Sequence, residues 1–421
     1  MASEDPLLPQ RSRKVLYLLG NLTQGGAEQT IINLATDHRS PFETQILAFS
    51  REGSLLKEKS QRLLFDDLSS RCRAPGASLF KQSIFGFWNK LRKQRWRYHI
   101  DEKLKRSQVS FCPPDVINPS LAARINEVLR KWQPDLVVTT LLESGGTLAC
   151  RFVLPRLQHP PRWIIREANH PERSVECLNR AVEDPLELIR YVHGYADCIV
   201  ACAEDIRHQL VQYGLSPDQI RTIRNGVREN ILLALDGTVP ACLPDGFNIL
   251  AIGRLHPQKR FDRLLKAFQL FLRQNPAYLH ILGDGPLKDE LIQQAKELGL
   301  DGHLHLHGST DPVPFLKAAN AFILSSDYEG YPNALLEALA AGLPCVAHDC
   351  EFGPREMIEH ESNGLLCNAT NPKVLTDALM RLYRNPELAK RLGRVARERA
   401  RLRTFADTRR DYEALYEELL T

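Results

Sequence analysis

Residues 321 to 347 read AFILSSDYEGYPNALLEALAAGLPCVA, a short apolar run followed by a polar loop and then a helical pattern. The run from Ala321 to Leu324 is typical of a buried parallel strand. Asn333 to Ala341 are mostly strong helix formers, Pro332 suits the first turn and Gly342 closes the helix. This order predicts one unit of an open α/β sheet, where ligands bind at the carboxyl ends of the strands.

Two glutamates lie around the start of this predicted helix. Glu329 is in the loop, and the side chain of Glu337 leans back toward the helix N-terminus. The free amides and the positive end of the helix dipole suit a phosphate, which two carboxylates would repel. We therefore expect the glutamates to accept hydrogen bonds from sugar hydroxyls. Taken singly, each is also consistent with an ordinary solvated surface charge.

The chain has 421 residues, so two domains are expected, because single cores stop growing well below this length. Apolar runs alternate with helical stretches in both halves, which predicts two doubly wound domains, residues 14–235 and 236–400. The join is expected in a Gly- and Pro-containing stretch between Asn225 and Asp245. Residues 1–13 are predicted to form a disordered tail. Residues 401–421 carry an apolar stripe, and we expect a helix that packs back on the first domain.

The composition is that of an ordinary globular protein, with 43% hydrophobic and 25% charged residues. A net charge of +4 is small for this length, so no nucleic-acid partner is expected. No apolar run is long enough to span a membrane, and the N-terminus does not read as a secretory signal. The expected location is the cytoplasm. The ten cysteines are scattered without a zinc-like spacing and are interpreted as reduced thiols.

Residues 80–108 differ in composition, because lysines and arginines alternate there with phenylalanines and tryptophans. A basic, aromatic helix suits anionic lipid headgroups or a phosphorylated acceptor. It is equally consistent with a solvated helix whose aromatic rings face the core. We interpret it as a basic aromatic insertion that allows peripheral contact with the inner face of an anionic membrane.

Two cations follow the apolar run Phe247 to Ile252, at a second predicted strand end. Arg254 and Lys259 could neutralise the charge that builds on a departing diphosphate, as Mg²⁺ does in other proteins. No Asp-x-Asp motif is present, and the nearest sequence is Asp327-Tyr328-Glu329. We therefore expect no metal and no other cofactor. Taken alone, both residues could also be surface cations.

Three segments together resemble the C-terminal domain of retaining GT-B glycosyltransferases of family GT4. They are GRLHPQKRFDRLLKAF from residue 253, HILGDGP from residue 280 and EGYPNALLEALAAGLPCVA from residue 329. The likeness is weaker in the first half, through NLTQGGAEQTIINLA from residue 21 and Asn225-Gly226-Val227. The resemblance implies two Rossmann-like domains that face each other across a cleft.

The resemblance also implies a role for each matching position. Arg254 and Lys259 would hold the donor diphosphate, Glu329 would contact the donor sugar and Glu337 would hold the ribose hydroxyls. Backbone amides at the helix start would meet the phosphates, and glycines would let the backbone approach the donor from both domains. These remaining donor-binding positions are Gly26, Gly253, Gly283, Gly285, Gly330, Tyr331, Pro332, Asn333 and Ala334.

For one functional position of the family, two residues of this chain are candidates. Many relatives place a histidine at the carboxyl end of a strand in the first domain, and the matching stretch here is WIIREANH from residue 163. His170 lies a few residues late, and Glu167 stands closer to the expected place. Either could orient or accept a proton from the acceptor hydroxyl. The alternating histidines His303, His305 and His307 are interpreted as part of an ordinary core strand rather than a metal cluster.

The resemblance predicts a retaining, metal-independent transferase. It would move a sugar from a nucleotide diphosphate sugar, with UDP favoured, to a hydroxyl of a lipid-linked or growing glycan in polysaccharide, lipopolysaccharide or glycolipid biosynthesis. The alternatives are a GT-B nucleotide-sugar epimerase or hydrolase, and a non-catalytic nucleotide-sugar-binding subunit. A Rossmann dehydrogenase is disfavoured, because Gly20 to Gly26 lacks the GxGxxG spacing.

Overall fold

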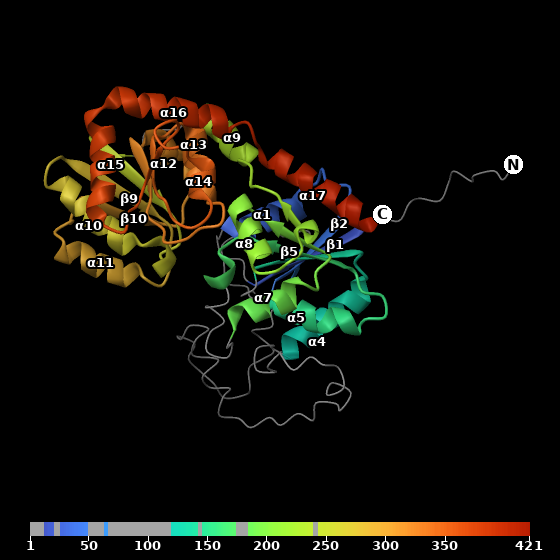
Figure 1. The fold of residues 1–421 in the computed structure, drawn as a ribbon. Helices are drawn as coiled ribbons and strands as arrows, with labels where there is room; N and C mark the ends of the chain where they lie inside the picture. The colour runs from blue at the N-terminus through green and yellow to red at the C-terminus, as the bar shows by residue number, and fades with distance from the viewer. Residues whose placement is uncertain are drawn as a thin grey trace.

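A computed structural model describes residues 12–20, 26–48, 63–65, 119–141, 145–173, 184–238 and 243–421. Within this part the chain forms two parallel sheets, each covered by helices on both faces and lying side by side (Figure 1). The predicted pair of doubly wound α/β domains is therefore confirmed. The tail to residue 11 and the basic aromatic insertion 80–108 lie outside the described residues.

The first sheet has the strand order β3-β2-β1-β4-β5-β6-β7, and all of its pairs are parallel. Alternate residues of each strand point to opposite faces, so two apolar cores form, one on each side of the sheet. The strands are β1 (Lys14–Leu19), β2 (Glu43–Ala48), β3 (Leu63–Phe65), β4 (Leu136–Thr140), β5 (Arg162–Glu167), β6 (Cys198–Ala201) and β7 (Ile220–Thr222).

The helices of this half divide between the two faces. One core is covered by α4 (Pro119–Trp132), α5 (Gly146–Val153), α7 (Pro185–His193) and α8 (Glu204–Gln212). The other core is covered by α1 (Gly26–Thr36). Short 3-10 turns at Leu154–Arg156 and Pro217–Gln219 complete the connections.

The second sheet has the order β10-β9-β8-β11-β12-β13 and is also parallel throughout. Its strands are β8 (Phe247–Ile252), β9 (Ala277–Leu282), β10 (Leu304–Gly308), β11 (Ala321–Leu324), β12 (Cys345–His348) and β13 (Leu365–Cys367). The helices around it are α9 (Glu229–Asp236), α10 (Phe261–Leu272), α11 (Lys288–Glu297), α12 (Val313–Ala318), α13 (Asn333–Ala341), α14 (Pro354–Met357), α15 (Pro372–Arg384) and α16 (Pro386–Ala400), with a 3-10 turn at Pro257–Lys259.

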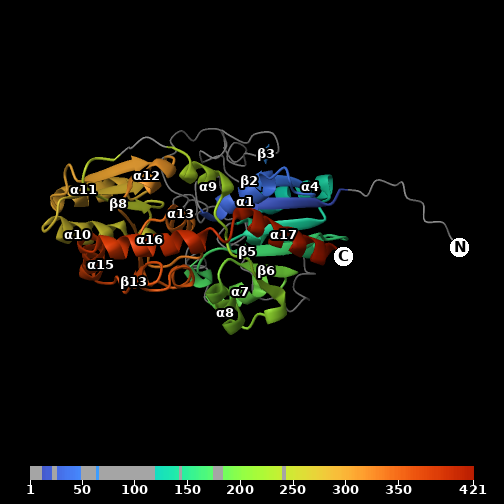
Figure 2. The same ribbon diagram turned by 90° about the horizontal axis from the view of Figure 1, so that it is seen from above.

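The last helix, α17 (Phe405–Leu420), leaves the second domain and packs on the first, as predicted (Figure 2). Tyr412, Leu415 and Tyr416 are buried in the same core as Tyr17 of β1. The hydroxyls of Tyr17 and Tyr416 lie 3.0 Å apart, so the buried polar groups satisfy each other.

The chain crosses between the domains twice, and the two crossings touch. Val227 of the first crossing pairs in parallel with Thr404 of the second. A Cβ atom on Gly226 would lie 1.9 Å from the carbonyl oxygen of Thr404, so only glycine fits there. Helix α9 buries Ile231 and Leu235 against the second domain. This packing favours a boundary ahead of α9, before the predicted Leu235, and we propose that boundary.

The stretch from residue 321 forms the elements that its sequence predicts. Strand β11 leads through a loop to α13, and Gly342 ends the helix in a left-handed conformation with φ of 85°. Pro332 differs slightly from the prediction, because it is the N-cap residue rather than part of the first turn. In the described part of the chain, no helix is both long enough and apolar enough to span a membrane.

Candidate active site

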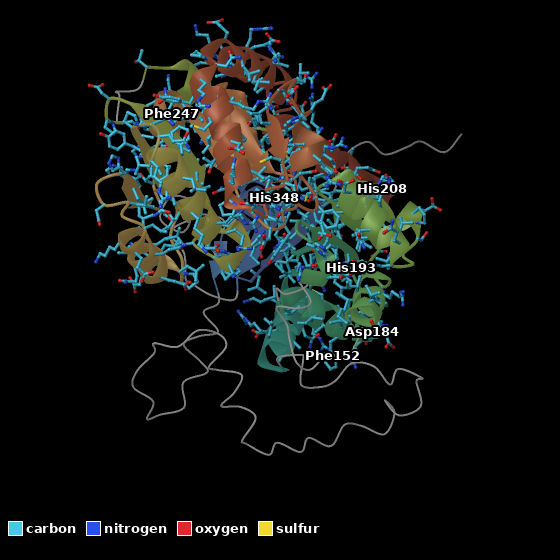
Figure 3. All side chains as sticks on the ribbon, turned by 60° about the vertical axis from the view of Figure 1, so that its left-hand side comes forward. Phe152, Asp184, His193, His208, Phe247 and His348 are labelled. Carbon is cyan, nitrogen blue, oxygen red and sulfur yellow. The ribbon has the colours of Figure 1, made fainter. Side chains whose placement is uncertain are left out.

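The carboxyl ends of the second sheet face the first domain. In Figure 3, Phe247 at the start of β8 lies on the far side of the second domain and His348 at the end of β12 lies nearer the first. The starts of α1 and α13 meet across the boundary, where the side-chain amide of Asn333 donates to the carbonyl of Gly26 over 3.2 Å. Gly26 therefore lies against the helix predicted to hold the donor phosphates.

Lys259 and Glu329 form a close ion pair at the second predicted strand end. The Lys259 Nζ lies 2.5 Å from Glu329 Oε1, which also accepts a hydrogen bond of 2.6 Å from the Ser326 hydroxyl. The side chain of Lys259 is 18% exposed and that of Glu329 is 7% exposed. The structure thus joins a cation and a carboxylate that are 70 positions apart in the chain.

Arg254 is exposed at the start of the loop after β8, and its carbonyl accepts the amide of His256. Its side chain makes no hydrogen bond or ion pair with the residues described. Its charge nevertheless acts on its surroundings: burial, together with the charges of Arg254 and Lys259, lowers the pKa of His256. Asp327 is paired with Arg260 and Arg263 instead, so the Asp327-Tyr328-Glu329 sequence has one carboxylate already neutralised.

Glu337 is bound by Arg228, a residue that the sequence analysis did not identify. Both Nε and Nη2 of Arg228 donate to Glu337 Oε1, over 3.1 and 2.8 Å. Glu337 is on the second turn of α13 and only 6% exposed. Its side chain is therefore not a solvated surface charge.

The start of α13 is left without a side-chain cap, because Pro332 offers none. The first amides of the helix, around Tyr331 to Ala334, therefore stay available to an anion, as helix N-termini commonly do. The neighbouring Asn225 fixes this turn from the first domain. Its side-chain amide donates to Asn333 Oδ1 over 2.8 Å and to the Tyr331 carbonyl over 3.3 Å.

Three of the predicted glycines, Gly283, Gly285 and Gly330, are sites of close backbone contact, whereas Gly26 and Gly253 face the side chains of Asn333 and Lys259. A Cβ atom on Gly283, where φ is +135°, would lie 2.0 Å from the carbonyl oxygen of Gly253, and one on Gly285 would lie 2.5 Å from that of Leu255. The loops after β8 and β9 therefore pack directly on each other. Gly330 approaches Ala168 of the first domain in the same way.

Comparison with known proteins identifies the family. Residues 244–399 match the model of glycosyl transferases group 1, and residues 24–230 match the model of glycosyltransferase family 4. The chain is 30% identical over 299 residues to the lipopolysaccharide core biosynthesis glycosyltransferase LpsE of Rhizobium meliloti, across 71% of this chain and 80% of that protein. The chain belongs to glycosyltransferase family 4. The predicted enzyme class, a glycosyltransferase, is confirmed.

Two further comparisons place this glycosyltransferase. It is 29% identical over 253 residues to an uncharacterized glycosyltransferase of Methanocaldococcus jannaschii, across 57% of this chain and 62% of that protein. The matched region covers 62% of that protein's length, 40% of an uncharacterized glycosyltransferase of Haemophilus influenzae and 32% of an exopolysaccharide phosphotransferase of Streptomyces coelicolor. The crystal structure of Anabaena HepE in complex with UDP and glucose has a TM-score of 0.70 at 19% identity, across 96% of this chain and 99% of HepE. The glycosyltransferase therefore has the predicted GT-B fold.

The two candidates for the open family position of this glycosyltransferase have hydrogen-bond partners in different domains. Glu167 is fully buried and its Oε2 lies 2.8 Å from Nε2 of His193 on α7. His170 reaches the second domain, where its Nε2 lies 2.9 Å from Glu351 Oε2. The Glu351 carbonyl accepts the amide of Glu329 over 3.3 Å. His170 is thus linked to Glu329 through Glu351, and its ring also lies edge-on to that of Tyr328 in the loop of Glu329.

Arg166 is a second residue that the sequence analysis missed. It precedes Glu167 on β5 and points to the opposite face, where it is 1% exposed and donates to Asn225 Oδ1 over 3.0 Å. A hydrogen-bonded chain therefore runs from β5 through Asn225 to the start of α13. An arginine directly after the apolar run Trp163 to Ile165 was the available signal.

The alternating histidines of the glycosyltransferase form a stack on β9 and β10. His280 lies between Asn248 Oδ1 at 2.9 Å and His307 Nε2 at 3.0 Å, and its ring stacks on that of His305. Burial, then the neighbouring imidazoles, lower the pKa of His280 to about 4. Over the described ranges, no cluster of three or more His, Cys, Asp or Glu side chains could hold a metal ion.

Proposed function

We propose that this glycosyltransferase moves a sugar from UDP-sugar, with retention of configuration, to a hydroxyl of a lipid-linked or growing glycan. The observation that carries the proposal is the ion pair of Lys259 and Glu329 beside the uncapped start of α13. A cation and free amides together suit a diphosphate, and the adjacent carboxylate suits sugar hydroxyls.

In the proposed reaction, the donor diphosphate lies between Lys259, Arg254 and the first amides of α13. Negative charge grows on the leaving phosphate as the bond to the sugar breaks. Lys259, which Glu329 holds in place, and the helix amides stabilise this charge with little reorganisation, and Arg254 adds a further positive charge. Glu329 holds the donor sugar, and Glu337 holds the ribose. The acceptor hydroxyl attacks from the side of the leaving phosphate, which takes its proton, and the configuration at the sugar carbon is retained.

The choice of UDP and of a glycan acceptor rests on what similar proteins bind or make. HepE was crystallised with UDP and glucose, and LpsE is a lipopolysaccharide core biosynthesis enzyme. We extend the proposal to polysaccharide, lipopolysaccharide or glycolipid biosynthesis in the cytoplasm. Contact with the inner face of the membrane through residues 80–108 is part of the same proposal, and those residues lie outside the described part.

For the acceptor site we propose His170, because it is linked through Glu351 to the loop that carries Glu329. Glu167 is the alternative, because its Oε1 has no hydrogen-bond partner in the described part of the chain although it is buried. Alanine substitutions distinguish the two candidates. Replacing the residue that acts on the acceptor should lower the rate of transfer to the acceptor and leave the affinity for UDP unchanged.

Product analysis tests the proposal. The full chain is incubated with a panel of radiolabelled UDP-sugars and lipid-linked or oligosaccharide acceptors, with and without EDTA. Labelled acceptor whose new linkage keeps the donor configuration is the expected product, at equal rates in EDTA. If free monosaccharide is the only product, the enzyme is a hydrolase rather than a transferase. If an epimerised nucleotide sugar is the only product, it is an epimerase. Binding of UDP without turnover of any panel member would favour the non-catalytic subunit.

A further inference from the structure

The contact between Arg228 and Glu337 uses only one of the two carboxylate oxygens. Nε and Nη2 of Arg228 both donate to Oε1, over 3.1 and 2.8 Å. Within the described part of the protein, Oε2 accepts no hydrogen bond. A carboxylate held in this way is fixed in orientation while its second oxygen can still accept hydrogen bonds from a ligand.

The backbone that carries Arg228 is held on both sides. Val227 is fully buried, its amide donates to the Arg403 carbonyl over 3.0 Å, and its carbonyl accepts the Phe405 amide over 2.8 Å. Arg228 is then the N-cap residue of α9. The guanidinium therefore starts from the fixed point where the two domain crossings meet, and it can hold the carboxylate with little freedom.

The ion pair also borders a small cavity between the domains. Its walls include residues of both domains and of the crossings, namely Thr30, Gly226, Arg228, Asn333, Glu337 and Phe405. The positively charged guanidinium offsets the charge of Glu337 at this place. This matters if a diphosphate binds at the nearby helix start, because two uncompensated anionic groups would repel each other.

We propose that Arg228 is a positioning residue that fixes Glu337 for the ribose diol and so sets the preference for ribonucleotides over deoxynucleotides. The inference rests on the proposed function, which gives the ribose to Glu337. Without Arg228 the carboxylate can turn away from the ribose. Nucleotides that carry the ribose hydroxyls then bind more weakly, whereas nucleotides without these hydroxyls keep their affinity.

Isothermal titration of the full chain with UDP and with 2′,3′-dideoxy-UDP tests this role. Wild type is expected to bind UDP more tightly by about tenfold or more, because hydrogen bonds to a charged group carry that much discrimination. Arg228→Met should reduce the ratio of the two affinities about tenfold, mainly by weakening UDP, and Arg228→Lys should give an intermediate ratio. Arg397→Met is the matched control, because Arg397 pairs with Asp236 on the exposed surface.

The outcomes separate the two levels of the proposal. An unchanged affinity ratio in Arg228→Met, with a reduced ratio in Glu337→Gln, would overturn the role of Arg228 and leave the ribose contact standing. Equal binding of both nucleotides by wild type would overturn this role and the ribose contact together, while sugar transfer remains the separate measure of the proposed function. If Arg228→Met folds poorly by thermal melting, Arg228→Gln carries the same measurement, because it keeps a donor but not the charge.

Discussion

A Cβ atom on Gly330 would lie 2.0 Å from the carbonyl oxygen of Ala168. Gly330 belongs to the loop after β11 in the second domain, and Ala168 follows β5 in the first. The two domains therefore meet here through backbone atoms, and the observed arrangement leaves no room for a side chain. The contact lies next to Glu329, so the spacing of the domains and the geometry of the candidate site are directly connected.

Gly330→Ala is expected to hold the domains apart and lower kcat/KM about 100-fold, because displacements near 1 Å can cost that much in a catalytic site. The melting temperature should change little, because neither core is altered. Small-angle scattering and steady-state kinetics provide the measurements. Gly237→Ala is the control, since its Cβ would meet only ordinary contacts of 3.6 Å. Unchanged kinetics in Gly330→Ala would show that the observed closed arrangement is not needed for turnover.

Glu329→Gln should lower kcat about 100-fold or more while UDP affinity stays near that of wild type, since the carboxylate is assigned to the sugar and a preorganised polar contact contributes that much. The fold should persist, because Gln can still accept from Ser326 and the partly exposed Lys259 can be resolvated. Rate assays, titration with UDP and thermal melting measure the three quantities. Glu297→Gln, on the exposed surface of α11, is the control. A matched loss of UDP affinity would place Glu329 at the phosphates instead.

Tyr416→Ala tests how much α17 stabilises the first domain. Tyr416 is 2% exposed, contacts the Tyr17 hydroxyl at 3.0 Å and packs edge-on against Phe42. Truncation of a buried aromatic side chain is expected to cost about 3–5 kcal/mol in the free energy of unfolding. Urea denaturation measures it, with Leu402→Ala as control because Leu402 is 83% exposed. Equal stability of the two variants would contradict the docking of α17.

The histidine stack predicts a loss of stability in acid. The pKa of His280 falls from 6.5 to about 4 on folding, so the folded protein excludes a proton that the unfolded chain binds. The contribution of neutral His280 to the free energy of unfolding is complete above pH 6.5 and is lost as the pH falls from there toward about 4. Over this range the unfolding equilibrium constant rises by up to about tenfold for each pH unit of acidification. Urea denaturation across this range measures the slope. His280→Gln should flatten it, and an unchanged slope would assign the acid sensitivity to other groups.

Much of the fold follows from local pattern. The strands β8 and β11 were expected because apolar runs bounded by polar or glycine residues have few alternatives. The strands β7 and β13 were not expected, because each has three residues and three residues show no periodicity. Pairing with a neighbouring strand, rather than their own sequence, makes them part of a sheet.

The candidate site divides in the same way. Glu329, Lys259 and the glycine positions were predicted from motifs, because the chemistry of a phosphate site restricts residue type and local spacing. Arg228 was not, since its partner Glu337 is 109 positions away and nothing near Arg228 in the sequence marks the contact. Asn225 was noted only as part of a motif, and its contact with Asn333 spans 108 positions.

The sequence by itself determined that this chain has two α/β domains, a carboxylate-flanked helix start and two cations at a strand end. These features depend on side-chain periodicity and on helix capping, which act over a few residues. Only the tertiary structure decided that Lys259 meets Glu329, that Arg228 holds Glu337 and that Gly330 lies on Ala168. Such contacts depend on where two sheets and two chain crossings come to lie, and hydrogen bonds and backbone clearances are decided within fractions of an ångström.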